Sequence, residues 1–148
     1  MPSDNKNIAR RIIDEVWNQG KLDALNDAVA ANYLGHDTLG PEIHGLEAFK
    51  KRIHSLRTAF PDLHLTVEDM FADGDVVVTR FNSRGTHKGS FQGIAPTGKH
   101  CQVSGITISR FADGKIAEAW VQTDALGLMQ QLGAVPALGQ AKAQAAPR

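Results

Sequence analysis

The chain has 148 residues, of which 42% are hydrophobic and 22% charged, a composition typical of one globular domain. Lys+Arg and Asp+Glu both total 16, and a formal net charge of zero argues against the basic surface of a nucleic-acid-binding protein. No stretch approaches the roughly 20 apolar residues that span a bilayer, and the N-terminus lacks the apolar segment of a secretory signal. A single cysteine, Cys101, excludes an internal disulfide. We therefore expect a cytoplasmic protein without nucleic-acid or membrane partners.

The first part of the chain carries the periodicity of amphipathic helices. Apolar residues at helical spacing predict a first helix that is capped by Asp4 or Asn5 and ends at Gly20. A second, short helix is predicted over 22–31, followed by a polar loop. A third helix over 46–60 has the clearest period, and Pro61 stops it because proline disfavours a helical conformation in the preceding residue.

From residue 63 the period changes to alternation, which predicts antiparallel strands. The strands are expected over 63–70, 76–87, 102–111 and 115–123, with hairpin turns at 72–75 and 113–114. The segment 87–99, rich in Gly and Pro, is a connection, and a short apolar helix ends at Gly133. This order predicts an α+β domain over residues 1–136, in which helices cover one face of a curved sheet and enclose a cavity. The tail 137–148 is predicted to be flexible.

Asp124 is the first candidate for chemistry, because it stands where the last strand gives way to the final helix. If the alternation continues, Asp124 points the same way as Trp120, into a pocket where one carboxylate can move a proton. The alternative is that Asp124 caps the helix. Arg80 lies among valines in a strand, and we expect it to be buried and paired with Glu118 or Asp124.

Other chemical signals are weaker. The six histidines show no metal-ligand spacing, and no nucleophile elbow, Walker loop or dinucleotide fingerprint occurs, so neither a metal nor a cofactor is expected. His36 and His87 are candidates for the cavity, the alternatives being a surface loop residue and a cap of the sheet. The side chains expected to line an apolar pocket, or only to form the core, are Trp17, Tyr33, Phe60, Phe71, Phe91, Trp120 and Met129.

Three segments together point to a family. They are FPDLHLTVEDMFADGD, GTHKGSFQGIAPTGK and SRFADGKIAEAWVQTDALGLMQQLG. Over about residues 8–133 the chain resembles the SnoaL-like polyketide cyclases, or ester cyclases, of the NTF2-like superfamily. The resemblance implies a cone-shaped barrel in which three N-terminal helices pack on a strongly curved, mainly antiparallel sheet. It also implies a homodimer or homotetramer.

The resemblance further implies a reaction, the cofactor-free intramolecular aldol condensation of a small apolar carbonyl or ester compound. Asp124 would be the acid/base of this reaction, and Arg80, His36 or His87 would stabilise enolate charge by hydrogen bonding. Other functions remain open on the residues alone: an isomerase, a dehydratase, a hydrolase, or a non-catalytic module that binds a small molecule. The fold and its motif do not fix the substrate.

Overall fold

The computed structural model describes residues 2–136, so the tail predicted over 137–148 lies outside the described residues. The elements are α1 (Pro2–Arg11), η1 (Ile12–Trp17), η2 (Leu22–Ala24), α2 (Leu25–Ala28), β1 (Val29–Asp37), β2 (Ile43–His44), α3 (Leu46–Ala59), β3 (His64–Asp73), β4 (Val76–Thr86), β5 (His100–Ala112), β6 (Lys115–Thr123) and α4 (Ala125–Leu132). Of these, η1 is a π-helical continuation of α1 and η2 is a short 3-10 turn. In the described residues no helix is long and apolar enough to cross a membrane.

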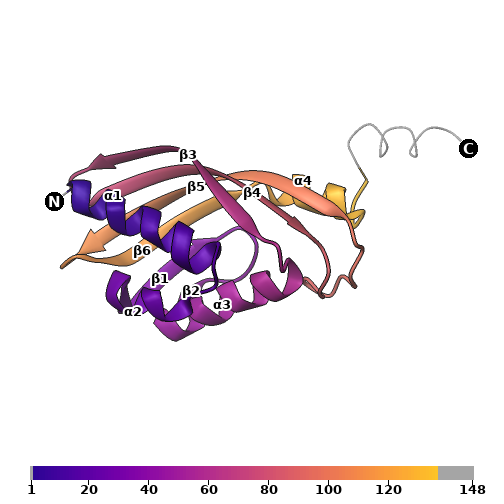
Figure 1. The fold of residues 1–148 in the computed structure, drawn as a ribbon, viewed down its shortest axis with the longest axis horizontal. Helices are drawn as coiled ribbons and strands as arrows, with labels where there is room; N and C mark the ends of the chain where they lie inside the picture. The colour runs from indigo at the N-terminus through magenta and orange to yellow at the C-terminus, as the bar shows by residue number, and fades with distance from the viewer. Residues whose placement is uncertain (1, 137–148) are drawn as a thin grey trace, which may run out of the picture.

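One six-stranded sheet organises the domain, in the order β2-β1-β6-β5-β4-β3. All neighbouring strands are antiparallel except β1 and β6, which run parallel. Figure 1 shows the long strands as a twisted, curved layer with α1, α2 and α3 along one side and α4 beyond the end of β6. The predicted α+β class is confirmed. The sheet is curved but open, so it does not close into a barrel.

The helices differ from the sequence-based expectation in two places. The first begins at Pro2, ahead of the predicted cap, and its π-helical last part leads to Gly20, whose φ of +76° is the left-handed conformation that ends helices. The second is shorter than predicted, because the chain becomes extended at Val29 and continues as β1. A strand therefore occupies residues for which a helix end and a loop were predicted. The third helix and its stop at Pro61 are confirmed.

The four predicted strands and both hairpins are confirmed, with register shifts in β3 and in β6. Asp113 and Gly114 both have positive φ, as a tight hairpin turn requires. The register then shifts, since Phe111 pairs with Ile116 but Arg110 pairs with Glu118. The extra residue on β6 reverses the alternation, so Ile116 faces the cavity while Glu118 faces outward. The strict alternation along β6, on which the predicted inward direction of Trp120 depends, therefore fails here.

The core is divided into two clusters of buried side chains. One surrounds Val16 and Ile53, between the helices and one half of the sheet, and the other surrounds Phe60 and Phe81. Trp17 packs against both.

Asn18 ties the end of the first helix to the edge strand β3. Its side-chain nitrogen donates to the carbonyl of Leu65 at 3.0 Å, and the Leu65 N–H donates to its side-chain oxygen at 2.7 Å. We expect Asn18→Ala to lower the free energy of unfolding by about 1–3 kcal/mol, because both backbone groups of Leu65 lose their partner. Urea unfolding measures this. Gln19→Ala, at the exposed neighbouring position, serves as the control. If Asn18→Ala lowers the free energy of unfolding no more than Gln19→Ala does, the assignment is contradicted.

Candidate functional site

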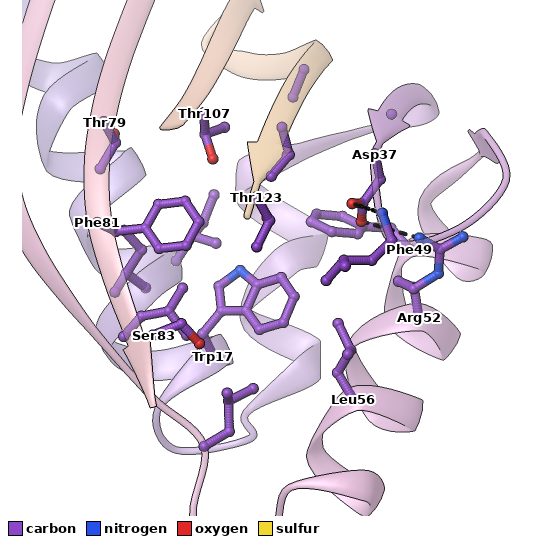
Figure 2. Close-up of a pocket in the computed structure, with 18 of the residues that line it drawn as sticks. Trp17, Asp37, Phe49, Arg52, Leu56, Thr79, Phe81, Ser83, Thr107 and Thr123 are labelled. Carbon is purple, nitrogen blue, oxygen red and sulfur yellow. Dashed lines mark hydrogen bonds and ion pairs between the residues drawn. The ribbon is translucent and has the colours of Figure 1, made fainter. Parts of the chain in front are cut away.

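A cavity of about 150 Å³ lies between the concave face of the sheet and the helices α1, η1 and α3. Its wall is mostly apolar, and aromatic side chains contribute much of it, among them Trp17, Phe49, Phe60 and Phe81. Figure 2 shows the Trp17 indole and the Phe81 ring facing this space from opposite elements. Such a cavity suits a small apolar ligand that carries few polar groups.

Two glycines on the sheet set the shape of the cavity. A Cβ atom at position 35 would lie 2.9 Å from the Tyr33 hydroxyl oxygen, and one at position 105 would lie 2.5 Å from the tip of the Phe81 ring. Cβ atoms do not approach other atoms this closely, so any other residue at position 35 or 105 would clash with the ring. With glycine at both positions, the rings of Tyr33 and Phe81 can pack directly against the strand backbone. The rings therefore line the cavity instead of filling it.

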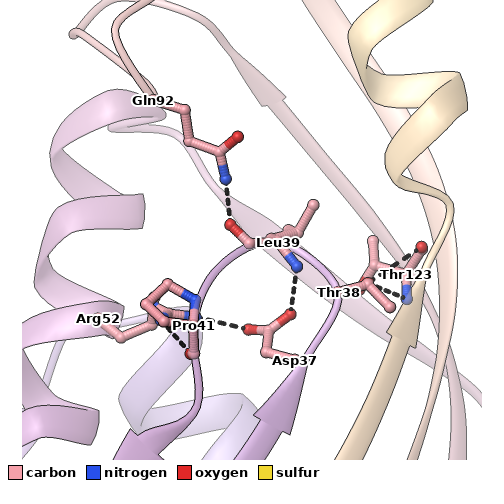
Figure 3. Close-up of polar contacts among 7 residues, drawn as sticks. All are labelled: Asp37, Thr38, Leu39, Pro41, Arg52, Gln92 and Thr123. Carbon is pink, nitrogen blue, oxygen red and sulfur yellow. Dashed lines mark hydrogen bonds and ion pairs between the residues drawn. The ribbon is translucent and has the colours of Figure 1, made fainter.

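The cavity carries one acidic side chain among the described residues, Asp37 at the end of β1. Its Oδ2 lies 3.1 Å from Nη1 of Arg52 on α3, and its Oδ1 accepts the Leu39 N–H at 2.9 Å. The Asp37 side chain is 12% exposed and that of Arg52 is 18% exposed. Figure 3 shows this pair where β1 runs into the following loop. A nearly buried carboxylate is thus held by a cation and a backbone donor, which offset its desolvation.

The loop after β1 is fastened on three sides. Thr38 and Thr123 exchange hydrogen bonds between the Thr38 hydroxyl and the Thr123 backbone, which joins the loop to the end of β6. Gln92 donates to the Leu39 carbonyl, and Arg52 donates to the Pro41 carbonyl at 2.8 Å (Figure 3). These bonds hold the backbone around Asp37 in place.

A groove of about 550 Å³ runs outside this loop, between α3 and the connection that follows β4. The groove and the cavity share Leu39, Arg52 and Leu56 as wall residues. Arg52, the partner of Asp37, therefore stands in the wall that separates the cavity from the groove. This is the position from which a charged group can meet a ligand that enters the cavity.

Tyr33 is the second ionisable group beside Asp37. Burial raises the pKa of its phenol well above the usual range, and the negative charge of Asp37 raises it further. Its ring stacks on Phe49 with centroids 4.6 Å apart and covers Gly35, the inward-facing residue next to Asp37 on β1. The Tyr33 hydroxyl therefore stays protonated and can donate a hydrogen bond inside the cavity.

Asp124 lies outside the cavity. It is exposed, and its carboxylate accepts the Gly127 N–H at 2.9 Å as the N-cap of α4, which confirms the capping alternative. The inward-facing residues at the end of β6 are Ala119, Val121 and Thr123, none of which is acidic. The expectation that Asp124 points into the pocket is wrong, because the chain turns into α4 immediately after Thr123.

Trp120 also faces away from the cavity. The bulge in β6 places it on the outer face, where it stacks on His36 with ring centroids 5.4 Å apart and lies under the guanidinium of Arg110. The two ring nitrogens of His36 each lie 2.8 Å from a carboxylate oxygen, one of Glu42 and one of Glu118. His36 is one of the residues that line the cavity, as predicted, but both nitrogens of its imidazole are engaged with carboxylates on the outer side of the sheet.

Arg80 and His87 do not line the cavity. Arg80 is on the outer face, half exposed, and pairs with Asp69 at 2.7 Å, so its predicted burial beside Glu118 or Asp124 is wrong. Because side chains alternate along β4, the residues on either side of Arg80, Thr79 and Phe81, point into the cavity instead. His87 is fully buried and accepts the Thr97 N–H on Nδ1 at 3.2 Å, which anchors the connection after β4.

The side chains predicted to line an apolar pocket divide into two groups. Trp17, Tyr33 and Phe60 line the cavity, and Phe91 lines the neighbouring groove. The others do not: Phe71 is 64% exposed on the outer face, Trp120 faces outward, and Met129 packs against the second core cluster. Within residues 2–136, no three His, Cys, Asp or Glu side chains gather as a metal site would require.

Sequence reasoning missed Asp37 and Arg52. Asp37 has the parity of Tyr33 and Gly35, a signal that is visible only once residues 29–37 are recognised as a strand. Arg52 follows Phe49 by three residues and precedes Leu56 by four, so it shares their helix face. A cation on the apolar face of the best-predicted helix was a readable signal for a buried acidic partner.

The comparisons with known proteins agree with this architecture. The family model of the SnoaL-like polyketide cyclases matches residues 7–132. This chain belongs to that family. A curated relative in Streptomyces galilaeus, the aklanonic acid methyl ester cyclase AcmA, is 30% identical over 131 residues, which are 84% of this chain and 87% of AcmA. The match indicates a cyclase-like enzyme.

Solved structures in the family superpose closely. A candidate SnoaL-like polyketide cyclase from Jannaschia sp. CCS1 has a TM-score of 0.84 at 27% identity, covering 91% of this chain and 95% of its own. IdmH, a candidate polyketide cyclase from Streptomyces antibioticus, has a TM-score of 0.75 at 31% identity, covering 87% and 98%. AclR, a candidate hydroxylase from S. galilaeus, has a TM-score of 0.81 at 26% identity, covering 92% and 100%. Members of one fold are thus assigned different reactions, so the reaction must be argued from the site.

The outer-face histidine gives a pH-dependent prediction. The hydrogen bond to Glu118 raises the pKa of His36, and Glu42 raises it further. The stability from the charged imidazole is therefore complete below the ordinary histidine pKa of about 6.5 and is lost as the pH rises through the higher folded-state value. Urea unfolding between about pH 6 and pH 9 should show a decline for the wild type and a flatter profile for His36→Gln. Parallel profiles would contradict this.

Proposed function

We propose that this protein is a cyclase-type enzyme in which Asp37 is the acid/base for a cofactor-free intramolecular aldol condensation. The observation that carries the proposal is that Asp37 is the acidic side chain in the wall of an otherwise apolar cavity, among the described residues. Asp37 takes the role that the sequence suggested for Asp124, which is exposed and occupied as a helix cap. A carboxylate oxygen within hydrogen-bond reach of an acidic C–H can accept its proton.

The chemistry needs only one such group. A carbon between two carbonyl groups already has an acidic C–H, and Asp37 removes that proton to leave an enolate. The enolate carbon attacks a second carbonyl carbon of the same molecule, which forms the new C–C bond and turns that carbonyl oxygen into an alkoxide. The protonated Asp37 then returns its proton to the alkoxide, so carboxylate and proton are both restored at the end of the cycle.

The hydrogen bonds around Asp37 are compatible with this role. Each carboxylate oxygen has two lone pairs, and in the structure Oδ1 accepts from Leu39 and Oδ2 from Arg52. One lone pair on each oxygen remains for the proton. When Asp37 is protonated, the Arg52 guanidinium keeps its positive charge in the cavity wall, where it can stabilise a developing enolate.

Tyr33 supplies a neutral donor to the same region. Its phenol keeps its proton because burial and Asp37 raise its pKa, so it can donate to an enolate or carbonyl oxygen without a change of charge. Its hydroxyl lies over Gly35, next to Asp37 on β1. Asp37, Arg52 and Tyr33 thus offer a base, a cation and a neutral donor from two elements, β1 and α3.

For the substrate, we propose a ring-bearing compound with carbonyl or ester groups. The support is the apolar wall of the cavity, the near-zero net charge of the chain, and the relationship to AcmA, which is a cyclase of aklanonic acid methyl ester. That ester is therefore the first compound to test. The exposed Phe71, Ile106 and Ile108 on the outer face of the sheet are compatible with self-association, and the homodimer or homotetramer stays a prediction.

The same substitution at two aspartates tests the assignment. Asp37→Asn keeps the shape and the oxygen that accepts the Leu39 N–H but removes the base, so cyclisation of aklanonic acid methyl ester should fall by about 100-fold or more. Asp124→Asn should retain turnover, since asparagine caps a helix as well as aspartate does. Product formation by chromatography and deuterium exchange at the acidic carbon measure the two steps, with circular dichroism as the control for folding.

The opposite pattern would overturn the proposal. If Asp124→Asn loses cyclisation and Asp37→Asn keeps it, Asp37 is a structural ion-pair partner only. If the wild type binds the ester but exchanges no deuterium and forms no product, the cavity is a binding site without this chemistry. Exchange without ring closure would place the protein among isomerase-type enzymes instead.

A further inference from the structure

Two threonines face each other on neighbouring strands at the concave face of the sheet. Thr79 on β4 pairs directly with Thr107 on β5, and Thr107 pairs in turn with Val121 on β6, which pairs with Asp37 on β1. Four cavity-lining residues on four strands thus form one transverse row. The row begins with two hydroxyls, passes an apolar side chain and ends at the proposed base.

The hydroxyls of Thr79 and Thr107 have no hydrogen-bond partner among the described residues. Both line the cavity, and Figure 2 shows the Thr107 oxygen directed into it, without a bond to any side chain drawn there. They are not sealed in the protein either, because the fully enclosed side-chain polar atoms that lack partners are His64 Nδ1 and His87 Nε2. The two hydroxyls are therefore open to whatever occupies the cavity.

Two hydroxyls without partners are not expected in an apolar wall if Thr79 and Thr107 only support the fold. Thr79 is 5% exposed, and the opposite wall of the cavity is formed by apolar residues of α1 and η1, such as Ala9 and Ile12. A buried hydroxyl without a partner is unfavourable compared with a methyl group of similar size. Valine would fill the same space on a strand without that disadvantage, and it does so at Val121 in the same row.

The spacing of the two hydroxyls fits a single oxygen atom. Side chains directly opposite each other on antiparallel strands have Cβ atoms about 5 Å apart. An O–H···O bond is about 2.7 Å long, so one carbonyl or phenol oxygen between the two threonines can bind both. The Trp17 indole N–H, which also lines the cavity and lacks a partner among the described residues, lies on the helical side of the same space (Figure 2).

We propose that Thr79 and Thr107 form an oxygen-binding subsite that fixes a carbonyl or phenol group of the substrate at a set distance from Asp37. Neighbouring strands are about 4.8 Å apart, so the Cα atoms of Thr107 and Asp37 are separated by about 10 Å across β6. The subsite rests on the proposed function and sharpens it. The substrate carries an oxygen on an apolar ring, one ring width or more from the acidic carbon that loses its proton.

Paired ligands that differ in one oxygen test the subsite without any turnover. β-Tetralone and tetralin have the same two-ring skeleton, and only the first carries a ketone. In the Thr79→Val/Thr107→Val variant, the affinity for β-tetralone should fall by about 5-fold or more, while tetralin binds as well as before. Titration followed by tryptophan fluorescence or calorimetry measures both affinities. Thr66→Val, an exposed threonine on β3, is the matched control and should change neither.

Thermal unfolding separates ligand binding from a structural role. Because the hydroxyls have no protein partner, the double variant should melt at the same temperature as the wild type or higher. A lower melting temperature with unchanged selectivity between the two ligands would mean that the hydroxyls hold structural water, and this would overturn the subsite. Equal losses for both ligands, or no saturable binding of β-tetralone to the wild type, would overturn it as well.

The outcome is independent of the acid/base assignment. If Asp37→Asn retains cyclisation while the double threonine variant loses its preference for the ketone, the subsite stands and the proposed base falls. If Asp37→Asn loses cyclisation while the threonine variant keeps its preference, the base stands and the subsite falls.

Discussion

The parallel pairing of β1 with β6 is the constraint on which the site depends. It places Tyr33, Gly35 and Asp37 beside the inward-facing residues of β6, and it gives α3 a surface on which to pack. Two consecutive residues, His36 and Asp37, then hold β1 in place from the two faces of the sheet. Asp37 bonds to Arg52 on the cavity side, and His36 bonds to Glu118 on the outer side. Without β1, the concave face would have hydroxyl groups but no carboxylate among the described residues.

This arrangement resolves a conflict between burial and chemistry. A carboxylate in an apolar wall is costly unless its charge is offset, and a base that is fully enclosed by partners has nothing left to accept a proton. Asp37 has one cationic partner and one backbone donor, and the cationic partner, Arg52, stands in the wall between the cavity and the outer groove. Because each carboxylate oxygen of Asp37 has only one partner, the carboxylate can still accept a proton from a substrate. The loop after β1 is fastened to β6, α3 and the connection after β4, so this geometry does not rely on the flexible end of a chain.

The elements with strong apolar periodicity can be predicted from the sequence. Prediction fails for a strand of mixed composition and for the faces of a strand that contains a bulge. The 46–60 helix and the four long strands follow directly from apolar spacing, and the family resemblance gives the architecture. The strand at 29–37 was missed because its alternation is interrupted by Gly35 and its side chains are mixed. One extra residue near Ala117 reversed the predicted faces of β6, so Trp120 was assigned to the wrong side of the sheet. A bulge of this kind leaves no mark in composition.

The contact between Phe81 and Gly105 gives one residue pair control over the room available inside. A methyl group at position 105 would meet both the tip of the ring and the backbone oxygen of Gln122, at 2.5 and 3.0 Å, so the strand could not absorb it and the ring would have to rotate into the interior. Conversely, trimming the ring would free space over a smooth stretch of backbone. Homologues that differ at these two positions should accept compounds of different bulk, and catalyst engineers who seek a larger or smaller scope can begin there without changing the acidic group.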